Sequence, residues 1–271
     1  MIRARAPATT ANIGAGFDCA GAALDLWNEL HVSEADSHPP TDSLVVRAFS
    51  CLADPDGLEF TLISNIPRER GLGSSAAVIS LGLVAGAIAA EVEPEPEVLL
   101  AKGLPLEGHA DNLAAALAGG VCLTWDGRRI ARIADEVPAT PVVVVPETRV
   151  KTAESRSALP EHVPHADAAY TVSRSALLGA ALATRSPDLF AAALSDRLHE
   201  PYRSPLLHKI RATLPPGALG ATLSGSGPSI VVWARPEAAE DCRSSLAQRF
   251  GDASVLALAI AARGAYAEQD V

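Results

Sequence analysis

The stretch Arg70-Gly71-Leu72-Gly73-Ser74-Ser75-Ala76-Ala77 leads into an apolar run that extends from Ala76 to Ala90. Two glycines and two serines before a helix are typical of a loop that binds phosphate. Glycine lets the main chain approach an anion, and the first amides of a helix lack helical partners and carry the positive end of its dipole. No lysine follows the glycines, so the common phosphate loop that ends in Gly-Lys is excluded. A glycine turn with a serine N-cap is the alternative explanation.

The composition limits what the rest of the chain can be. A length of 271 residues with 48% hydrophobic residues is comfortable for two modest domains. The net charge of −10 argues against binding to nucleic acid or to an anionic membrane surface. The four cysteines lack metal-ligand spacing and the N-terminus lacks the apolar core of a signal peptide. We therefore expect a cytoplasmic protein with reduced cysteines.

Alternating strand and helix patterns fill both halves of the chain. In the first half they predict strands at 2–6, 30–34 and 58–63, helices at 44–53, 76–90 and 113–117, loops at 7–18 and 35–43, and a hairpin of 121–125 with 128–133. The run 91–97 is acidic and predicts a surface connection. In the second half they predict strands at 141–146, 220–223, 230–234 and 255–260, and helices from 152, 167, 187, 206 and 237. Prolines at 138–141 suggest a boundary between domains 1–137 and 138–271.

Two clusters of polar residues in the first half are candidates for chemistry. Asn12 and Asp18 flank the glycines of the first loop, where a carboxylate suits an ammonium or hydroxyl group; an Asx turn is the alternative. Glu107, His109 and Asn112 lie near a predicted helix start. An oxygen ligand for magnesium at Glu107, with His109 and Asn112 on a substrate, fits the preference of magnesium for oxygen. An acidic first turn that complements the helix dipole is the alternative.

The second half supplies arginines. Thr152 and Arg156 are four residues apart, on one face of the predicted helix, and Arg203 follows near another helix end. Paired guanidinium groups suit a carboxylate or a phosphate, which they grip with two hydrogen bonds each. Surface salt bridges are the alternative for both arginines.

Taken together, these stretches resemble the GHMP kinases, and within them the homoserine kinases. Three glycine-containing stretches are similar to the three motifs of the superfamily: 7–18, 71–77 and 224–229. Three others, 107–112, 152–156 and 200–203, are similar to homoserine kinases in particular. The matching segments run in family order from the first strand to the last, so their combination is far more specific than any one of them.

The resemblance implies an α+β fold of two domains, an N-terminal domain like ribosomal protein S5 domain 2 and a C-terminal ferredoxin-like domain. It also implies ATP-dependent phosphorylation of the side-chain hydroxyl of L-homoserine, which supplies threonine synthesis, with magnesium as cofactor. Related activities that stay open are phosphorylation of another small hydroxyl compound and ligand binding without turnover. A homodimer is expected from the family and from the frequency of twofold assemblies.

The resemblance also implies roles for single residues. It assigns the ATP phosphates to the stretch that comprises Arg70, Gly71, Leu72, Gly73, Ser74, Ser75 and Ala76, and magnesium to Ser75 and Glu107. It assigns the homoserine site to Asn12, Asp18, His109, Asn112, Arg156 and Arg203, with Thr152, Arg156 and Asn112 close to the reacting groups.

Asn112 stands where other superfamily members carry an aspartate base. Its amide cannot take a proton at neutral pH. Phosphoryl transfer tolerates that, because alignment and charge neutralisation carry most of the rate. The sequence leaves open whether Asn112 or the adjacent Asp111 faces the reacting hydroxyl.

Overall fold

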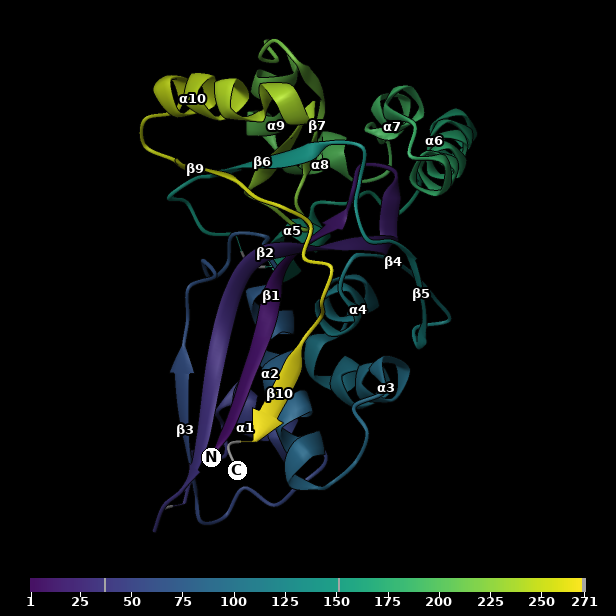
Figure 1. The fold of residues 1–271 in the computed structure, drawn as a ribbon. Coiled ribbons are helices and arrows are strands. Elements are labelled where there is room, and N and C mark those ends of the chain that lie inside the picture. The colour runs from purple at the N-terminus through teal and green to yellow at the C-terminus, as the bar shows by residue number, and fades with distance from the viewer. Residues whose placement is uncertain (37, 151, 270–271) are drawn as a thin grey trace.

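The computed structural model describes residues 1–36, 38–150 and 152–269. Within these ranges the chain forms two antiparallel sheets, each accompanied by helices, at different ends of the molecule (Figure 1). The first sheet has six strands in the order β10-β1-β2-β4-β5, with β3 paired to β2. The second has four strands in the order β7-β8-β6-β9. This mixture of antiparallel sheets and helices confirms the predicted α+β class.

The first sheet consists of β1 (Ile2–Asn12), β2 (Gly16–Glu34), β3 (Leu58–Ile63), β4 (Val121–Trp125), β5 (Arg129–Ala134) and β10 (Tyr266–Gln269). Its helices are α1 (Leu44–Phe49), α2 (Ser74–Ala89), α3 (Pro96–Glu107) and α4 (Ala110–Ala118). The second sheet consists of β6 (Thr140–Val145), β7 (Ala218–Leu223), β8 (Ile230–Ala234) and β9 (Ser254–Ala257). The remaining helices are α5 (Thr152–Ser157), α6 (His165–Thr184), α7 (Pro187–Ala193), α8 (Glu200–Arg203), α9 (Pro205–Arg211), the short 3-10 helix η1 (Pro236–Ala238) and α10 (Ala239–Arg249). We call the first sheet with α1–α4 the first unit, and the second sheet with the remaining helices the second unit.

The predicted loop at 7–18 is wrong for most of its length, because β1 continues past Pro7 and β2 begins at Gly16. The pairing of β1 with β2 shifts register between Pro7 and Ala8. A proline, which has no N–H to donate, is tolerated at such an irregularity. Only a tight turn at 13–15 separates the two strands. The first motif is therefore held rigidly by a long hairpin.

Helix α2 is the central helix of the first unit, and its residues Ala76 to Ala87 are all buried. A helix that is apolar on every side is typical of a protein core. Its two glycines allow α1 to approach closely. A Cβ at Gly82 would lie 2.3 Å from the carbonyl oxygen of Val45, and one at Gly86 would lie 2.7 Å from that of Phe49. This packing fixes the second half of α2 against α1, while the N-terminus of α2 follows the glycine-containing stretch 70–73.

The sequence-based prediction of no helix between the acidic run 91–97 and Leu106 is wrong, because α3 occupies this segment. Pro96 occupies the first turn of α3, where a proline is favoured, and a second proline lies inside the helix at Pro105. These prolines obscured the helical pattern. The helix ends at Glu107, and Gly108 follows with a positive φ of 84°. The end of α3 therefore determines the position of the Glu107 carboxylate.

The division into domains 1–137 and 138–271 stays a prediction, and the structure adds one exception to it. After β9 the chain returns to the first sheet, where β10 pairs antiparallel with β1 from Ile2↔Gln269 to Arg5↔Tyr266. The predicted strand 255–260 is shorter, since β9 ends at Ala257. Residue 37, in the predicted loop 35–43, lies outside the described ranges. No helix in the described ranges is long and apolar enough to cross a bilayer.

Candidate active site

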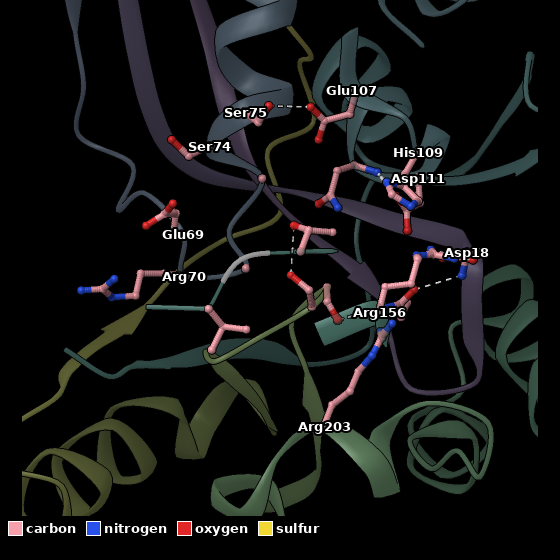
Figure 2. Close-up of a pocket in the computed structure, with 18 residues that line it drawn as sticks. Asp18, Glu69, Arg70, Ser74, Ser75, Glu107, His109, Asp111, Arg156 and Arg203 are labelled. Carbon is pink, nitrogen blue, oxygen red and sulfur yellow. Dashed lines mark hydrogen bonds and ion pairs between the residues drawn. The ribbon is translucent and has the colours of Figure 1, made fainter. Parts of the chain in front are cut away.

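A polar cavity of about 260 Å³ lies where residues 70–77, here called the glycine loop, meet the second unit (Figure 2). In this view Ser75 and Glu107 line it from above, and Arg156 and Arg203 from below. Thirteen predicted site residues line the cavity: Asn12, Asp18, Arg70, Gly71, Gly73, Ser74, Ser75, Glu107, His109, Asn112, Thr152, Arg156 and Arg203. Leu72 and Ala76 do not line it, because their side chains are buried behind the loop.

The glycine loop is shaped by contacts that exclude side chains. Gly73 has a φ of 62°, and a Cβ there would lie 1.8 Å from the Oγ1 atom of Thr9. Gly73 is also the N-cap residue of α2, and no side chain caps this helix. The alternative of a serine N-cap is therefore wrong. The amides at the start of α2 have no helical partner and are available to an anion.

The third glycine-rich stretch, residues 224–229 of the second unit, contacts and supports the glycine loop. The hydroxyl of Ser224 lies 2.9 Å from Oγ1 of Thr10 and donates to the carbonyl oxygen of Gly71 at 2.6 Å. A Cβ at Gly71 would lie only 2.3 Å from the carbonyl oxygen of Ser224. The two glycine-rich stretches are thus in direct main-chain contact, and the Ser229 amide also donates to the carbonyl of Arg70 at 3.2 Å.

The Ser75 hydroxyl donates to Oε2 of Glu107 at 2.6 Å. Burial raises the pKa of the Glu107 carboxyl to about 7, although the Ser75 hydrogen bond opposes the shift. A cation at this place would stabilise the ionised carboxylate. Among the residues that the structure describes, no three His, Cys, Asp or Glu side chains gather as a metal cage. A hydroxyl and a carboxylate fit magnesium, which takes oxygen ligands and commonly completes its shell with phosphate and water.

Asn112 and Asp111 both line the cavity from the start of α4. Oδ1 of Asn112 accepts a hydrogen bond of 2.6 Å from the Thr9 hydroxyl, which directs its NH₂ group elsewhere. Asp111 is only 4% exposed, and burial is the main cause that raises the pKa of its carboxyl. One Asp111 carboxylate oxygen accepts a hydrogen bond of 2.7 Å from the main-chain N–H of Asn112. His109 precedes them as the N-cap residue of α4, without a side-chain cap bond.

Asp18 and Arg156 form an ion pair across the cavity, although 138 positions separate them. Nη2 of Arg156 lies 2.7 and 2.9 Å from the two Asp18 oxygens. Asn12 holds Asp18 in place, because its Oδ1 accepts the Asp18 amide at 3.0 Å while its Nδ2 donates to the carbonyl of Gly225 at 3.0 Å. The Asn12 amide is therefore used within the protein.

Arg203 lies beside Arg156 at the same end of the cavity. Its Nε donates to the carbonyl of Ser155 at 3.3 Å. Burial lowers the pKa of Arg203, and the nearby charge of Arg156 lowers it further. Two adjacent guanidinium groups, one of them half-buried, form a site where an anion would relieve mutual repulsion.

Arg70 and Thr152 lie at the edge of the cavity. The Arg70 side chain extends away from the other labelled residues in Figure 2, and its guanidinium donates to the main-chain carbonyls of Pro146, Glu147 and Arg68. This charge is engaged in joining the two units. The Thr152 hydroxyl lies 3.4 Å from that of Ser226.

Sequence reasoning missed several residues that line the cavity: Glu69, Val150, Gly225 and Ser226. Gly225 and Ser226 lie within the third motif, so the motif itself was a signal for them. No pattern in the sequence distinguishes Glu69 or Val150. Thr9, which holds Asn112, was within the first motif but carried no predicted role.

Comparison with known proteins agrees with this geometry. The family model for the GHMP kinases N terminal domain matches residues 43–120, and that for the GHMP kinases C terminal matches 180–252. The homoserine kinase of Clavibacter michiganensis is 40% identical over 259 residues, which cover 85% of this chain and 82% of that protein. The homoserine kinase of Streptomyces coelicolor is 39% identical, with 88% of this chain and 86% of that protein covered.

A solved structure gives the same result for the fold. The crystal structure of homoserine kinase from Cytophaga hutchinsonii superposes with a TM-score of 0.84 at 26% identity, covering 98% of this chain and 97% of that one. The predicted two-domain fold of this superfamily is thereby confirmed. The chain belongs to the GHMP kinase family, in its homoserine kinase branch.

Proposed function

We propose that this chain transfers the γ-phosphoryl group of ATP to the side-chain hydroxyl of L-homoserine, giving O-phospho-L-homoserine. The observation that carries the proposal is the single cavity that Ser75 and Glu107 share with Arg156, Arg203 and Asp18. It combines a phosphate-binding helix start with a site for both charges of an amino acid.

The nucleotide side of the proposal rests on α2 and its surroundings. The free amides at Ser74 and Ser75 suit the phosphates. A second cavity of about 420 Å³ contacts the same two serines and is lined by the side chains of Leu44, Leu62 and Val78. An apolar groove beside a phosphate site suits the flat face of a base. We assign it to the adenine of ATP.

The amino-acid side rests on charge complementarity. Arg156 and Arg203 would hold the substrate carboxylate, and Asp18 its ammonium group. The Asp18–Arg156 ion pair has the same two charges as a zwitterion. An amino acid can therefore replace this internal pair without leaving either charge unpaired. An uncharged alcohol would not do so.

Phosphoryl transfer at this site would depend on alignment. With its Oδ1 bonded to Thr9, Asn112 offers only its NH₂ group, which donates to the substrate hydroxyl and orients it. The helix start holds the phosphates, and Ser75 and Glu107 would hold magnesium. When bound, this ion neutralises charge on the phosphates. Thr152 lies at the rim of the same cavity, near the place of the reacting groups.

The test is incubation of the purified chain with ATP, magnesium and L-homoserine, with phosphohomoserine detected by mass spectrometry. Formation of O-phospho-L-homoserine, with L-serine and mevalonate much poorer substrates, is the expected result. Rapid turnover of another small alcohol with none of L-homoserine would replace the substrate. Binding of both ligands without product would instead make the chain a non-catalytic relative.

A further inference from the structure

The ring of Phe17 lies against three groups that belong to the second unit. It stacks on the imidazole of His199, with ring centroids 4.8 Å apart and planes inclined by 16°. The guanidinium carbon of Arg203 lies over the same ring at 5.3 Å from its centroid, and that of Arg156 at 5.8 Å. Phe17 itself comes from the first motif, between Gly16 and Asp18. One aromatic ring thus contacts both arginines of the cavity.

Two guanidinium groups that share one ring repel each other unless something offsets their charge. The electron-rich face of an aromatic ring attracts cations and does so most strongly where water is excluded. Arg156 has a second partner in Asp18, whereas Arg203 donates to the main-chain carbonyl of Ser155. The Phe17 ring is thus a contact that Arg156 and Arg203 have in common.

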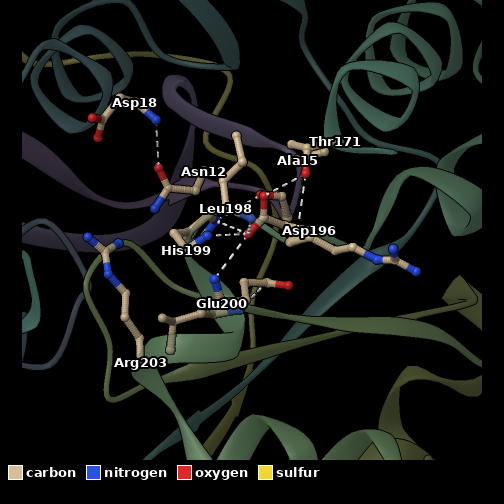
Figure 3. A network of polar contacts seen from close by, with 12 residues as sticks. Asn12, Ala15, Asp18, Thr171, Asp196, Leu198, His199, Glu200 and Arg203 are labelled. Atoms are coloured by element: carbon tan, nitrogen blue, oxygen red, sulfur yellow. Dashed lines mark hydrogen bonds and ion pairs between the residues drawn. The ribbon is translucent and has the colours of Figure 1, made fainter. Parts of the chain in front are cut away.

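The base of this stack is held rigidly. His199 is fully buried, and its Nε2 lies 2.9 Å from the carbonyl oxygen of Gly14, in the turn before Phe17. Figure 3 shows Asp196 beside it, where Oδ2 accepts the amides of Leu198, His199 and Glu200 at 2.9, 2.6 and 3.0 Å.

These bonds fix the start of α8, the short helix that ends at Arg203. The position of the Phe17 ring and that of the Arg203 guanidinium are consequently set by one connected group of buried residues.

We propose that Phe17, supported by the His199 ring, is a positioning residue that holds Arg156 and Arg203 together for the carboxylate of the substrate. This inference rests on the proposed function for the identity of the substrate. It goes beyond that function because Phe17 does not line the cavity and carries no group that contacts phosphate. Its effect passes entirely through the two guanidinium groups.

The decisive variants are Phe17→Leu, which keeps an apolar side chain but removes the ring, and Phe17→Tyr, which keeps the ring. We expect Phe17→Leu to raise KM for L-homoserine roughly tenfold. KM for ATP should change less than twofold, since the ring acts through Arg156 and Arg203, which we assign to L-homoserine. Phe17→Tyr should restore KM for L-homoserine to near its wild-type value.

Phe250→Leu is the matched control. The Phe250 ring, just after α10, also lies under two cations, Lys209 at 5.5 Å and Arg249 at 4.9 Å, and it does not line the cavity. It should leave both KM values unchanged. A selective effect of Phe17→Leu, absent in this control, supports positioning. An equal rise of both KM values, or a fall in kcat alone, would overturn the inference.

Calorimetric titration of L-homoserine into wild type and Phe17→Leu, without ATP, separates this inference from the proposed function. Weaker binding to the variant supports positioning even if the wild type forms no product, in which case only the proposed function fails. Equal binding to both proteins, or no binding to either, refutes the positioning role. Thermal unfolding of the variant verifies that it is folded.

Discussion

The hydroxyl of Ser75 donates a hydrogen bond of 2.6 Å to Oε2 of Glu107, and this contact joins the first turn of α2 to the last residue of α3. The two residues are 32 positions apart. Each is placed by a helix terminus rather than by a loop, so the pair has a fixed separation. Two oxygen-bearing side chains beside free helix amides suit a magnesium ion on a phosphate.

Replacing Ser75 by alanine tests this relationship. We expect Ser75→Ala to lower kcat roughly 10- to 100-fold and to raise the magnesium concentration needed for half-maximal rate, because one oxygen ligand is lost. KM for L-homoserine should change little. Steady-state kinetics over a magnesium series measures both effects. Ser173→Ala removes an exposed hydroxyl that donates to a main-chain carbonyl in α6 and should change neither. Wild-type magnesium dependence in Ser75→Ala would remove Ser75 from the metal site.

Gly73 offers a steric test of the loop. An alanine Cβ there would lie 1.8 Å from the Thr9 hydroxyl and 3.2 Å from Oδ1 of Asn112, on a residue with positive φ. We expect Gly73→Ala to lower the free energy of unfolding by about 1–3 kcal/mol and kcat more than tenfold. Urea denaturation and kinetics measure the two effects.

The control for this substitution is Gly179→Ala, in the middle of α6. Apart from its own turn of helix, no atom lies within 4 Å of the position of its added Cβ. Alanine in a helix interior is more favourable than glycine by about 0.5–1 kcal/mol, so this variant should be slightly more stable than wild type. If Gly73→Ala were as stable and active as Gly179→Ala, the loop would not depend on the tight contact with Thr9.

Local patterns were sufficient for the elements that local physics determines. The apolar run after Gly73 predicted α2, and the strand patterns at 121–125 and 128–133 predicted the β4–β5 hairpin, in which Trp125 pairs with Arg129. The motif residues around Ser75 and Glu107 were also identified from their chemistry and family resemblance. In each case the residues that specify the structure are neighbours in the sequence, or lie in stretches long enough to match a family.

Long-range placement was beyond the sequence. Nothing in Tyr266–Gln269 indicates that this segment pairs with the first strand, because the two partners lie at opposite ends of the sequence. The family resemblance assigned Arg70 to the ATP phosphates as part of the stretch 70–76, yet carbonyls just after β6 accept its hydrogen bonds. The Asp18–Arg156 pair likewise depends on how the second unit places α5. Such contacts follow from packing between distant segments, which no local pattern encodes.

Arg156 tests the assignment of the substrate carboxylate. Lysine keeps the charge but loses the planar, two-pronged hydrogen bonding of the guanidinium. We expect Arg156→Lys to raise KM for L-homoserine roughly 10- to 100-fold and to leave KM for ATP within twofold. Arg129→Lys, at an exposed ion pair with Glu97, should change neither value. A rise in KM for ATP alone would place Arg156 on the nucleotide instead.

Glu200 makes the stability of the protein depend on pH. Its side chain is fully buried, where it accepts the amide of Leu223 at 2.9 Å and pairs with Arg211 at 2.6 Å. Burial outweighs these partners and raises the pKa of its carboxyl from 4.5 to about 7. Between these two values the native state holds a proton that the unfolded chain has released. The free energy of unfolding therefore falls as pH rises through this range.

The shift predicts that wild type loses up to about 3 kcal/mol of stability between pH 5 and pH 8 through this group alone. Glu200→Gln cannot titrate, so the free energy of unfolding of wild type minus that of the variant should fall by that amount as pH rises. Urea denaturation at four pH values measures it. Glu240→Gln removes an exposed carboxyl whose pKa is lowered by Arg243. The free energy of unfolding of wild type minus that of this variant should therefore not fall between pH 5 and pH 8. If the free energy of unfolding of wild type minus that of Glu200→Gln stays constant or rises with pH, then Arg211 and Leu223 keep Glu200 ionised, because their stabilisation exceeds the cost of burying the charge.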